Sequence, residues 1–265
     1  MTRTLLIPRI LVAGAALLAA APASAQTADP PRPPMARTVA WADTTHGDVR
    51  VDPYFWLRDD QRKDTAVINY LEAENRYAEA MMAHTAALQE RLYQEMRGRI
   101  KEDDLSVPER IGGYYYYERT EAGKQYPVYA RRRGSLDAPE EVMLDLNQMA
   151  EGKRYLSVGN YEVSPDGRLL AFLVDTTGAE RLTLMVKDLA TGRILPDRVD
   201  SVNYSLAWAA DNRTLFYGTS DAANRPYRVW RHVLGTDPAT DVKLAEEPDE
   251  LFRVGCGSPR TGATC

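Results

Sequence analysis

A repeated β-type motif constrains this chain more than any other feature. Residues 163–172 read VSPDGRLLAF, and residues 208–217 repeat the pattern in weaker form as WAADNRTLFY. Asp166 and Asp211 occupy the same place in the two copies and are 45 residues apart, a spacing typical of stacked or radially arranged β units. In each copy a turn signal precedes an apolar run of strand type, which we expect to form the inner edge of its unit. The repeat therefore predicts the blades of a β-propeller.

The same period predicts a third copy near residues 256–262, but the sequence there reads GSPRTGATC from Gly257 to Cys265. Codons can be chosen for these residues that, after the first two bases are dropped, encode Val-Ala-Pro-Asp-Gly-Arg-Tyr-Leu, which is the expected third copy. We therefore expect residues 255–265 to be an out-of-frame tail, produced by one inserted or deleted base near codon 256. On this hypothesis the chain is the front portion of a longer protein.

The N-terminus has the pattern of an export signal. Arg3 and Arg9 precede an apolar stretch from Ile10 to Ala21, and Ala23-Ser24-Ala25 supplies a small-residue cleavage site. An uncleaved membrane anchor is the alternative, but the apolar stretch is shorter than the ~20 residues that a membrane span needs. We expect residues 1–25 to be a signal peptide, residues 26–37 to be a Pro-rich linker, and the mature protein to be periplasmic or secreted without a stable membrane anchor.

The composition excludes several classes of partner. The net charge is −5, with 44% hydrophobic and 27% charged residues, which is ordinary for a soluble globular protein. A slightly acidic chain lacks the positive field that attracts nucleic acid. Cys256 and Cys265 are the only cysteines, and both lie in the suspected tail, so they support neither a disulfide framework nor a metal site. We expect no cofactor and no metal.

Residues 38–108 form a predicted N-terminal helical segment. Between Asp64 and Ile100, apolar positions recur at steps of three, four or seven, which places them along one stripe of a long helix or of two helices with a bend. Asp64 is a plausible N-cap, and Gly98 a plausible end. The stripe consists of Val67, Leu71, Ala78, Met81, Thr85, Leu88, Leu92 and Met96.

After Pro108 the period changes to two, with Gly, Asn and Asp at the breaks. Three successive sets of short strands are predicted between residues 109 and 254, which indicates a partial β-propeller of about three blades. The first set is Tyr114–Arg119, Tyr126–Arg132 and Glu141–Leu146; the second is Arg168–Asp175, Leu182–Asp188 and Arg193–Leu195; the third is Thr214–Ser220, Tyr227–Val233 and Val242–Ala245.

Several longer segments resemble the prolyl oligopeptidase family of serine peptidases, and within it oligopeptidase B. They are HGDVRVDPYFWLRDD at 46–60, YLEAEN at 70–75, RIKEDD at 99–104, EAGKQYPVYARRRG at 121–134 and DLATG at 188–192. The resemblance covers about Thr38 to Val254. It implies an N-terminal helical segment, a seven-bladed propeller that admits only short peptides, and a C-terminal α/β-hydrolase domain carrying Ser, Asp and His. It also implies cleavage after Arg or Lys.

The sequence offers no catalytic, cofactor-binding or metal-binding residues. It lacks the Gly-x-Ser-x-Gly elbow with which an α/β-hydrolase presents its serine, so the family's catalytic domain is expected to be absent from this chain. We expect structural or solvent roles for the three histidines, His46, His84 and His232. We also expect packing rather than ligand binding by Tyr114–Tyr117 and Asp52–Trp56, and a solvated strand end at Arg131–Arg133.

Two functional hypotheses remain open. The first is the N-terminal and propeller portion of a serine oligopeptidase, whose partners are short peptide substrates and the missing hydrolase domain. The second is a non-catalytic propeller binding module or a pseudogene product. On the first hypothesis the helical stripe has lost its partner and three blades leave open sheet edges. We therefore expect the chain alone to be inactive and poorly folded.

Overall fold

The computed structural model describes residues 31–258. The expected signal peptide and the last residues of the suspected tail lie outside this range. The chain divides between Arg99 and Ile100 into two compact units, each of which is described by itself. In the described range, no helix is both long enough and apolar enough to cross a bilayer.

The first unit is a small hairpin followed by two helices. Asp64 begins the first helix, because its carboxylate accepts a hydrogen bond from the Ala66 N–H at 2.8 Å. A single 3₁₀ turn bends the chain before the second helix, which ends at Gly98. Of the two arrangements expected from the sequence, one long helix or two helices with a bend, the structure has the second, and its bounds after Asp64 and at Gly98 agree with the predicted N-cap and end. In order, the elements are β1 (Ala42–Thr45), β2 (Asp48–Val51), η1 (Phe55–Leu57), α1 (Thr65–Met82), η2 (Ala83–Thr85) and α2 (Ala86–Gly98).

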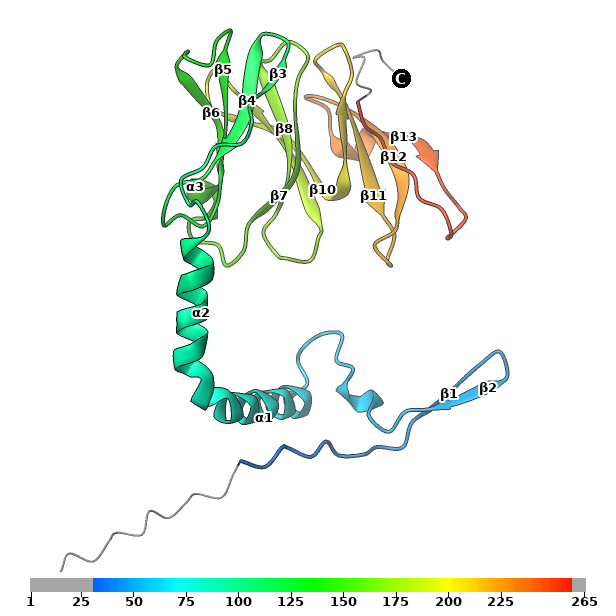
Figure 1. Ribbon diagram of the computed structural model, residues 1–265. Helices are drawn as coiled ribbons and strands as arrows, with labels where there is room; N and C mark the ends of the chain where they lie inside the picture. Colours follow the sequence, from blue (N-terminus) through cyan, green and yellow to red (C-terminus); the bar gives the residue numbers. More distant parts are fainter. Residues whose placement is uncertain (1–30, 259–265) are drawn as a thin grey trace, which may run out of the picture. The chain divides into compact units, whose positions relative to one another are not determined.

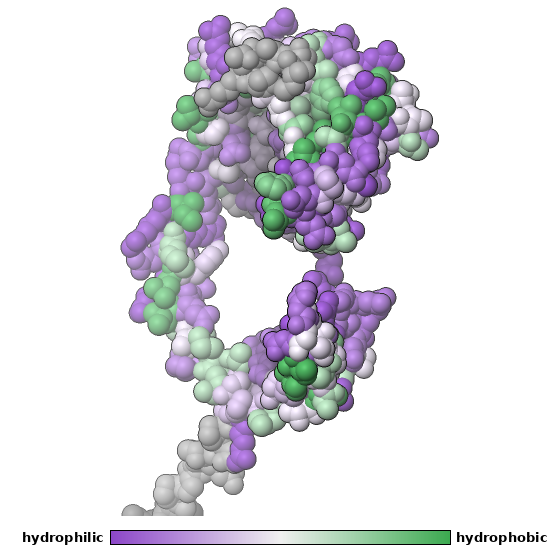
Figure 2. All heavy atoms as spheres, turned by 90° about the vertical axis from the view of Figure 1, so that its right-hand side faces the viewer, coloured by the Kyte–Doolittle hydropathy of each residue, from purple (hydrophilic) through white to green (hydrophobic). Residues whose placement is uncertain are grey.

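The apolar stripe of these helices is largely exposed. Val67 is buried, and it is the only buried residue of α1, whereas α2 has none. Figure 2 shows apolar side chains at the surface of the helical segment among polar ones. The exposed members of the stripe are Leu71, Met81, Leu88, Leu92 and Met96. A face of this kind is typical of a surface that binds another protein segment.

The second unit consists of two antiparallel sheets that together make three blades (Figure 1). Blade 1 is the four-stranded sheet β3-β4-β5-β6. The other sheet has seven strands in the order β13-β12-β11-β10-β9-β8-β7, and it contains blades 2 and 3. The strands are β3 (Glu109–Ile111), β4 (Tyr114–Arg119), β5 (Val128–Arg133), β6 (Glu140–Asp145), β7 (Ser157–Val163), β8 (Leu169–Asp175), β9 (Leu182–Asp188), β10 (Ile194–Trp208), β11 (Thr214–Ser220), β12 (Pro226–Val233) and β13 (Val242–Glu246). Two short helices, α3 (Leu146–Ala150) and η3 (Pro238–Thr240), lie in the connections.

Strand β10 belongs to two blades. Its 15 residues pair with β9 from Ile194 to Val202 and with β11 from Val202 to Trp208. The register shifts on both sides of Val202, and Ser201 has a positive φ of 60°, as expected at a bulge that bends a strand. Blade 2 therefore passes into blade 3 without a loop.

The repeated turns of blades 2 and 3 are equivalent in conformation and contact each other. Gly167 and Asn212 occupy the same place in the two copies of the motif, and both have left-handed backbones, with φ of 75° and 57°. Gly and Asn are the residues that tolerate this region. The Asn212 Oδ1 also accepts a hydrogen bond from the Asp166 N–H at 2.8 Å. The repeat predicted from the sequence is thus a repeat of structure.

The expectation that the apolar run after each turn forms the inner edge of its unit is wrong. In blade 2 this run is β8, which pairs with β7 on one side and β9 on the other. The edge strand is β7, whose residues are all half-buried. The run is continuously apolar because a blade between two others is covered on both faces, so alternate residues of β8 enter two different cores.

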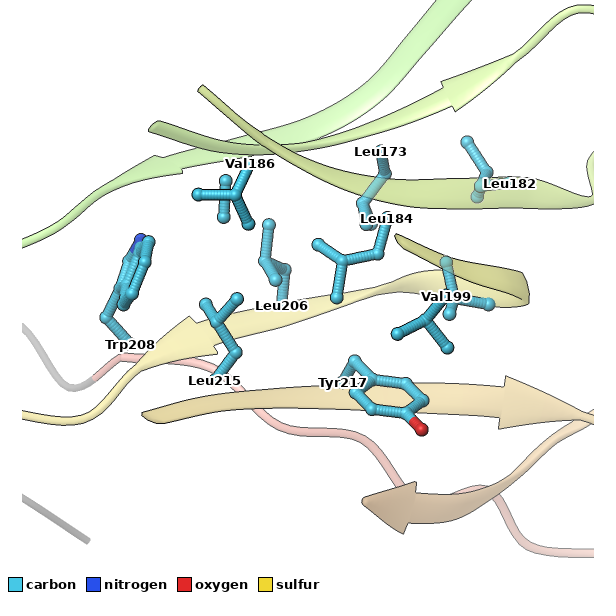
Figure 3. Packing of buried hydrophobic residues seen from close by; sticks show 11 residues of the cluster. Leu173, Leu182, Leu184, Val186, Val199, Leu206, Trp208, Leu215 and Tyr217 are labelled. Carbon is cyan, nitrogen blue, oxygen red and sulfur yellow. The ribbon is translucent and has the colours of Figure 1, made fainter. Parts of the chain in front are cut away.

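Two apolar clusters join the three blades. Between blades 2 and 3, side chains of β8 and β9 meet side chains of β10 and β11, as Figure 3 shows for Leu173, Leu184, Leu206 and Leu215. Between blades 1 and 2, the cluster contains Met143, Leu144, Leu146, Leu156, Leu170, Phe172 and Val174.

Gly218 on β11 provides a test of the packing between β10 and β11. A Cβ at Gly218 would lie 2.5 Å from Oδ1 of Asn203, and Asn203 is buried on β10. We expect Gly218→Ala to lower the free energy of unfolding by about 1–3 kcal/mol, because overpacking forces neighbouring groups to move. Gly113→Ala is the matched control, since a Cβ there meets nothing within 4 Å. Equal urea midpoints for the two variants would contradict the packing at Gly218.

Candidate functional site

The three histidines lie on separate elements. His46 follows β1 in a turn, with a φ of 54°. His84 lies on η2, where its Nδ1 is 2.9 Å from the carbonyl oxygen of Met81. His232 lies on β12 and is fully buried. Within residues 31–258, no histidine ring is hydrogen-bonded to a serine hydroxyl, although such a contact defines a Ser-His catalytic pair.

His232 is the centre of a buried polar cluster between blades 2 and 3. Its Nδ1 lies 2.7 Å from Oδ1 of Asp241, and its Nε2 lies 3.2 Å from Oδ1 of Asp197. The side chains of Asp197 and Asp241 are only 6% and 2% exposed. Asp197 lies on the part of β10 that pairs with β9, and Asp241 directly precedes β13. The imidazole therefore connects the outer strand of blade 2 to blade 3. We name His232, Asp197 and Asp241, with the residue that completes them below, the His232 cluster.

Tyr217 completes the cluster from β11. Its hydroxyl donates to Oδ2 of Asp241 at 2.8 Å. Burial, followed by the hydrogen bond to Asp241, raises the pKa of Tyr217 above its ordinary value, so the phenol remains a donor. The cluster holds acids and an imidazole but no nucleophile beside them, and its geometry fits a polar tie between blades. In the described range, no group of three His, Cys, Asp or Glu side chains is arranged to hold a metal ion.

Neither carboxylate of the cluster was singled out from the sequence. Asp197 stands 35 residues before His232, and only the path of β10 from one blade to the next brings the two together. The available signal was weak. Asp197 stands two residues before Val199 on the same strand, so the two side chains share the buried face.

The sequence interpretation of Arg131 as part of a solvated strand end is wrong. Arg131 on β5 is only 4% exposed. Its Nη1 donates to the carbonyl oxygen of Gly167 at 2.7 Å, and its Nε lies 2.8 Å from Oε2 of Glu141. The guanidinium also lies over the ring of Tyr114, 4.0 Å from the ring centroid. Arg131 is buried because it joins blade 1 to the turn of blade 2.

The edge strand β7 and the second half of β10, which is the first strand of blade 3, also contact each other directly. The Asn160 amide nitrogen donates to the carbonyl oxygen of Tyr204 at 3.0 Å, and the Trp208 indole donates to that of Glu162 at 2.9 Å. Burial raises the pKa of Glu162 above its ordinary value. Strands in this position line the central channel when a propeller ring is complete.

A cavity of about 700 Å³ opens between blades 1 and 2. We name it the inter-blade cavity. Its blade 2 wall is the face of β8, β9 and β10 that carries Phe172, Met185 and Lys187, and the opposite wall comes from the end of β6 and from α3. The side chains that line it are Leu144, Asp145, Gln148, Met149, Lys153, Leu156, Phe172, Val174, Thr176, Thr177, Arg181, Thr183, Met185, Lys187, Ile194 and Arg198.

Comparison with known proteins identifies relatives over nearly the whole chain. The family described as "Prolyl oligopeptidase, N-terminal beta-propeller domain" matches residues 33–264. Dipeptidyl aminopeptidase BI of Pseudoxanthomonas mexicana is 41% identical, over 95% of this chain and 37% of that protein. Protease 2 of Moraxella lacunata is 39% identical, over 86% of this chain and 34% of that protein.

Solved structures of similar proteins agree in fold. Oligopeptidase B from Leishmania major has a TM-score of 0.78 and 37% identity, over 84% of this chain and 34% of that one. Oligopeptidase B from Trypanosoma brucei, with covalently bound antipain, has a TM-score of 0.80 and 32% identity, over 87% of this chain and 35% of that one. The chain thus spans about a third of the length of these relatives. Its described residues form three blades and contain no α/β-hydrolase domain.

Proposed function

Because the chain belongs to the prolyl oligopeptidase family, we propose that it is the N-terminal segment and first propeller portion of a serine-type oligopeptidase. In that enzyme the propeller restricts access to short peptides, and the hydrolysis takes place in a C-terminal α/β-hydrolase domain. The observation that carries the proposal is the family match over residues 33–264, combined with three blades that superpose on oligopeptidase B.

We propose cleavage after Arg or Lys as the specificity of the whole enzyme. Two solved oligopeptidase B structures, at 37% and 32% identity, support this assignment. Release of dipeptides from a free N-terminus is the second candidate, and it is favoured by the 41% identity to a dipeptidyl aminopeptidase. An arginyl amide with a blocked N-terminus distinguishes the two, because only an endopeptidase accepts it.

This chain alone is proposed to be inactive. The support is the placement of its histidines, since His232 is enclosed by two aspartates and an α/β-hydrolase needs a serine elbow that this sequence lacks. Its physiological partners are then the hydrolase domain and short peptides. A periplasmic or secreted location remains a proposal that rests on the N-terminal sequence pattern.

The expected result for the purified chain is hydrolysis of a blocked arginyl amide at the rate of the buffer blank. The matched control is the product of the same gene with its reading frame corrected and extended to include a hydrolase domain, which we expect to hydrolyse the substrate. A second control replaces the elbow serine of the extended protein by alanine. Turnover by the 265-residue chain above the blank would contradict the proposal.

A non-catalytic binding module or a pseudogene product remains the alternative. Genomic DNA from about codon 250 through the following kilobase separates the hypotheses. A single-base shift followed by coding for a Gly-x-Ser-x-Gly elbow supports the peptidase, whereas an intact frame that ends at Cys265 supports the alternative.

A further inference from the structure

We propose that the inter-blade cavity binds a small anionic amphiphile, a molecule with one carboxylate head and an aliphatic or aromatic body. The volume of about 700 Å³ falls within the range of small-molecule sites, roughly 300–1,000 Å³. Both walls belong to the same compact unit. The inference is independent of the proposed peptidase activity, because the cavity lies on blades 1 and 2 alone.

The inner part of the cavity is apolar. Phe172 and Val174 come from β8, Leu144 comes from β6, and Leu156 comes from the connection that enters β7. These four side chains are nearly fully buried, from 1% to 7% exposed. Met149 and Met185 extend the apolar lining, and their flexible thioether chains adapt to bodies of different shape. Such a lining excludes a wholly polar ligand and favours a hydrocarbon body.

The charges around this lining are predominantly positive. Lys153, Arg181, Lys187 and Arg198 line the cavity, and Asp145 is the only carboxylate among the lining residues. The Asp145 carboxylate already caps α3, where it accepts the N–H groups of Asn147 and Gln148. Arg198 is paired with Asp200 at 2.9 Å. A negative head group is therefore complementary to the site, and a cationic one is not.

Lys187 provides the specific reason to expect an anion. The side chain is half-buried, and its ammonium donates to the carbonyl oxygen of Met143 at 2.7 Å. Burial lowers the pKa of Lys187 below its ordinary value. An ammonium has three donors, and its bond to Met143 uses one. A carboxylate in the cavity would offset the desolvation of this charge, with an attraction that is stronger than in bulk water.

Thr183, Met185 and Lys187 alternate along β9 with Leu182, Leu184 and Val186. The second set enters the core between blades 2 and 3. The first set faces the cavity, so the pleat of one strand separates an apolar core from a mixed, basic surface. Arg181, directly before β9, places a second positive charge at the same opening.

Isothermal titration of the purified chain with decanoate, below its micelle-forming concentration, tests the proposal. Decanol and decyltrimethylammonium carry the same hydrocarbon body without the negative charge. We expect one decanoate per chain, bound at least tenfold more tightly than either control compound. Equal affinity for all three would overturn the proposal, since the site would then be only an apolar gap.

Two variants locate the site. Lys187→Met keeps the length and packing of the side chain, and Arg181→Gln changes an exposed side chain that the fold does not need. Each is expected to raise the dissociation constant for decanoate at least fivefold. Arg213→Gln is the matched control, because Arg213 is also an exposed arginine but lies in the turn before β11, outside the cavity lining, and it leaves binding unchanged. If Lys187→Met does not fold, Arg181→Gln decides alone. Unchanged binding in Arg181→Gln would overturn the assignment.

Discussion

Replacement of His232 by leucine is expected to lower the free energy of unfolding by about 3–5 kcal/mol. The ring separates two aspartates whose side chains are 6% and 2% exposed, and the variant leaves both carboxylates buried without their shared partner. Urea unfolding at pH 7, followed by far-UV circular dichroism, measures the change. His84→Leu is the control, because His84 is exposed and surface substitutions usually change stability by about 0.5 kcal/mol or less.

The origin of this loss can be separated from simple loss of packing. In the His232→Leu background, Asp241→Asn removes one of the two unpaired charges and is expected to recover part of the lost stability. In the parent chain the same substitution weakens the contact between His232 Nδ1 and Oδ1 of Asp241, which are 2.7 Å apart, and it is expected to be destabilising. Opposite signs in the two backgrounds show coupling between the residues. Additive effects, or a His232→Leu loss below about 1 kcal/mol, would refute the electrostatic account of the His232 cluster.

Replacement of Phe172 by alanine is expected to have an effect of similar size. Phe172 is 1% exposed and lies in the cluster between blades 1 and 2, where truncation of a phenylalanine typically costs about 3–5 kcal/mol. Because this cluster holds blade 1 against blade 2, we also expect blade 1 to lose its protection from hydrogen exchange before blades 2 and 3. Hydrogen exchange resolved by mass spectrometry measures this order.

Two further variants make this prediction specific. Phe172→Leu keeps most of the buried volume and is expected to cost less than half as much. Phe252→Ala removes a ring that is 59% exposed and is expected to leave stability nearly unchanged. Uniform loss of protection in all three blades of Phe172→Ala would contradict a separate attachment of blade 1.

The sequence predicted the strands that lie within blades and missed the strands at their inner edges. Leu182–Asp188 and Thr214–Ser220 were predicted with the bounds that the structure has, because most of their buried positions carry apolar side chains that mark them as strands. Strand β7 was missed. Gly159 and Asn160 interrupt its β pattern, yet Gly159 is required there, since a Cβ would come within 2.7 Å of Leu182 and Tyr204.

Polar contacts between blades could not be predicted from the sequence. Arg131 stands in a run of three arginines beside Gly134, a pattern typical of a solvated surface, yet its partner Gly167 is 36 residues away. The inter-blade cavity combines β6, α3 and the face of β9, and its shape depends on the distance between two sheets. Periodicity along one strand identifies a face but not what lies opposite it.

The continuity of β10 gives the unit an unequal resistance to mechanical load. Blades 2 and 3 share one continuous strand, whose first half is hydrogen-bonded to β9 and whose second half is hydrogen-bonded to β11. Tension along the chain therefore acts on blades 2 and 3 as shear, which loads many backbone hydrogen bonds at once. Blade 1 shares no strand with blade 2: its covalent connection is α3 and the segment up to Ser157, and its other contacts are side-chain packing and a few hydrogen bonds. Pulling on its end would separate it in a peeling geometry, at lower force, as the first event in an extension trace.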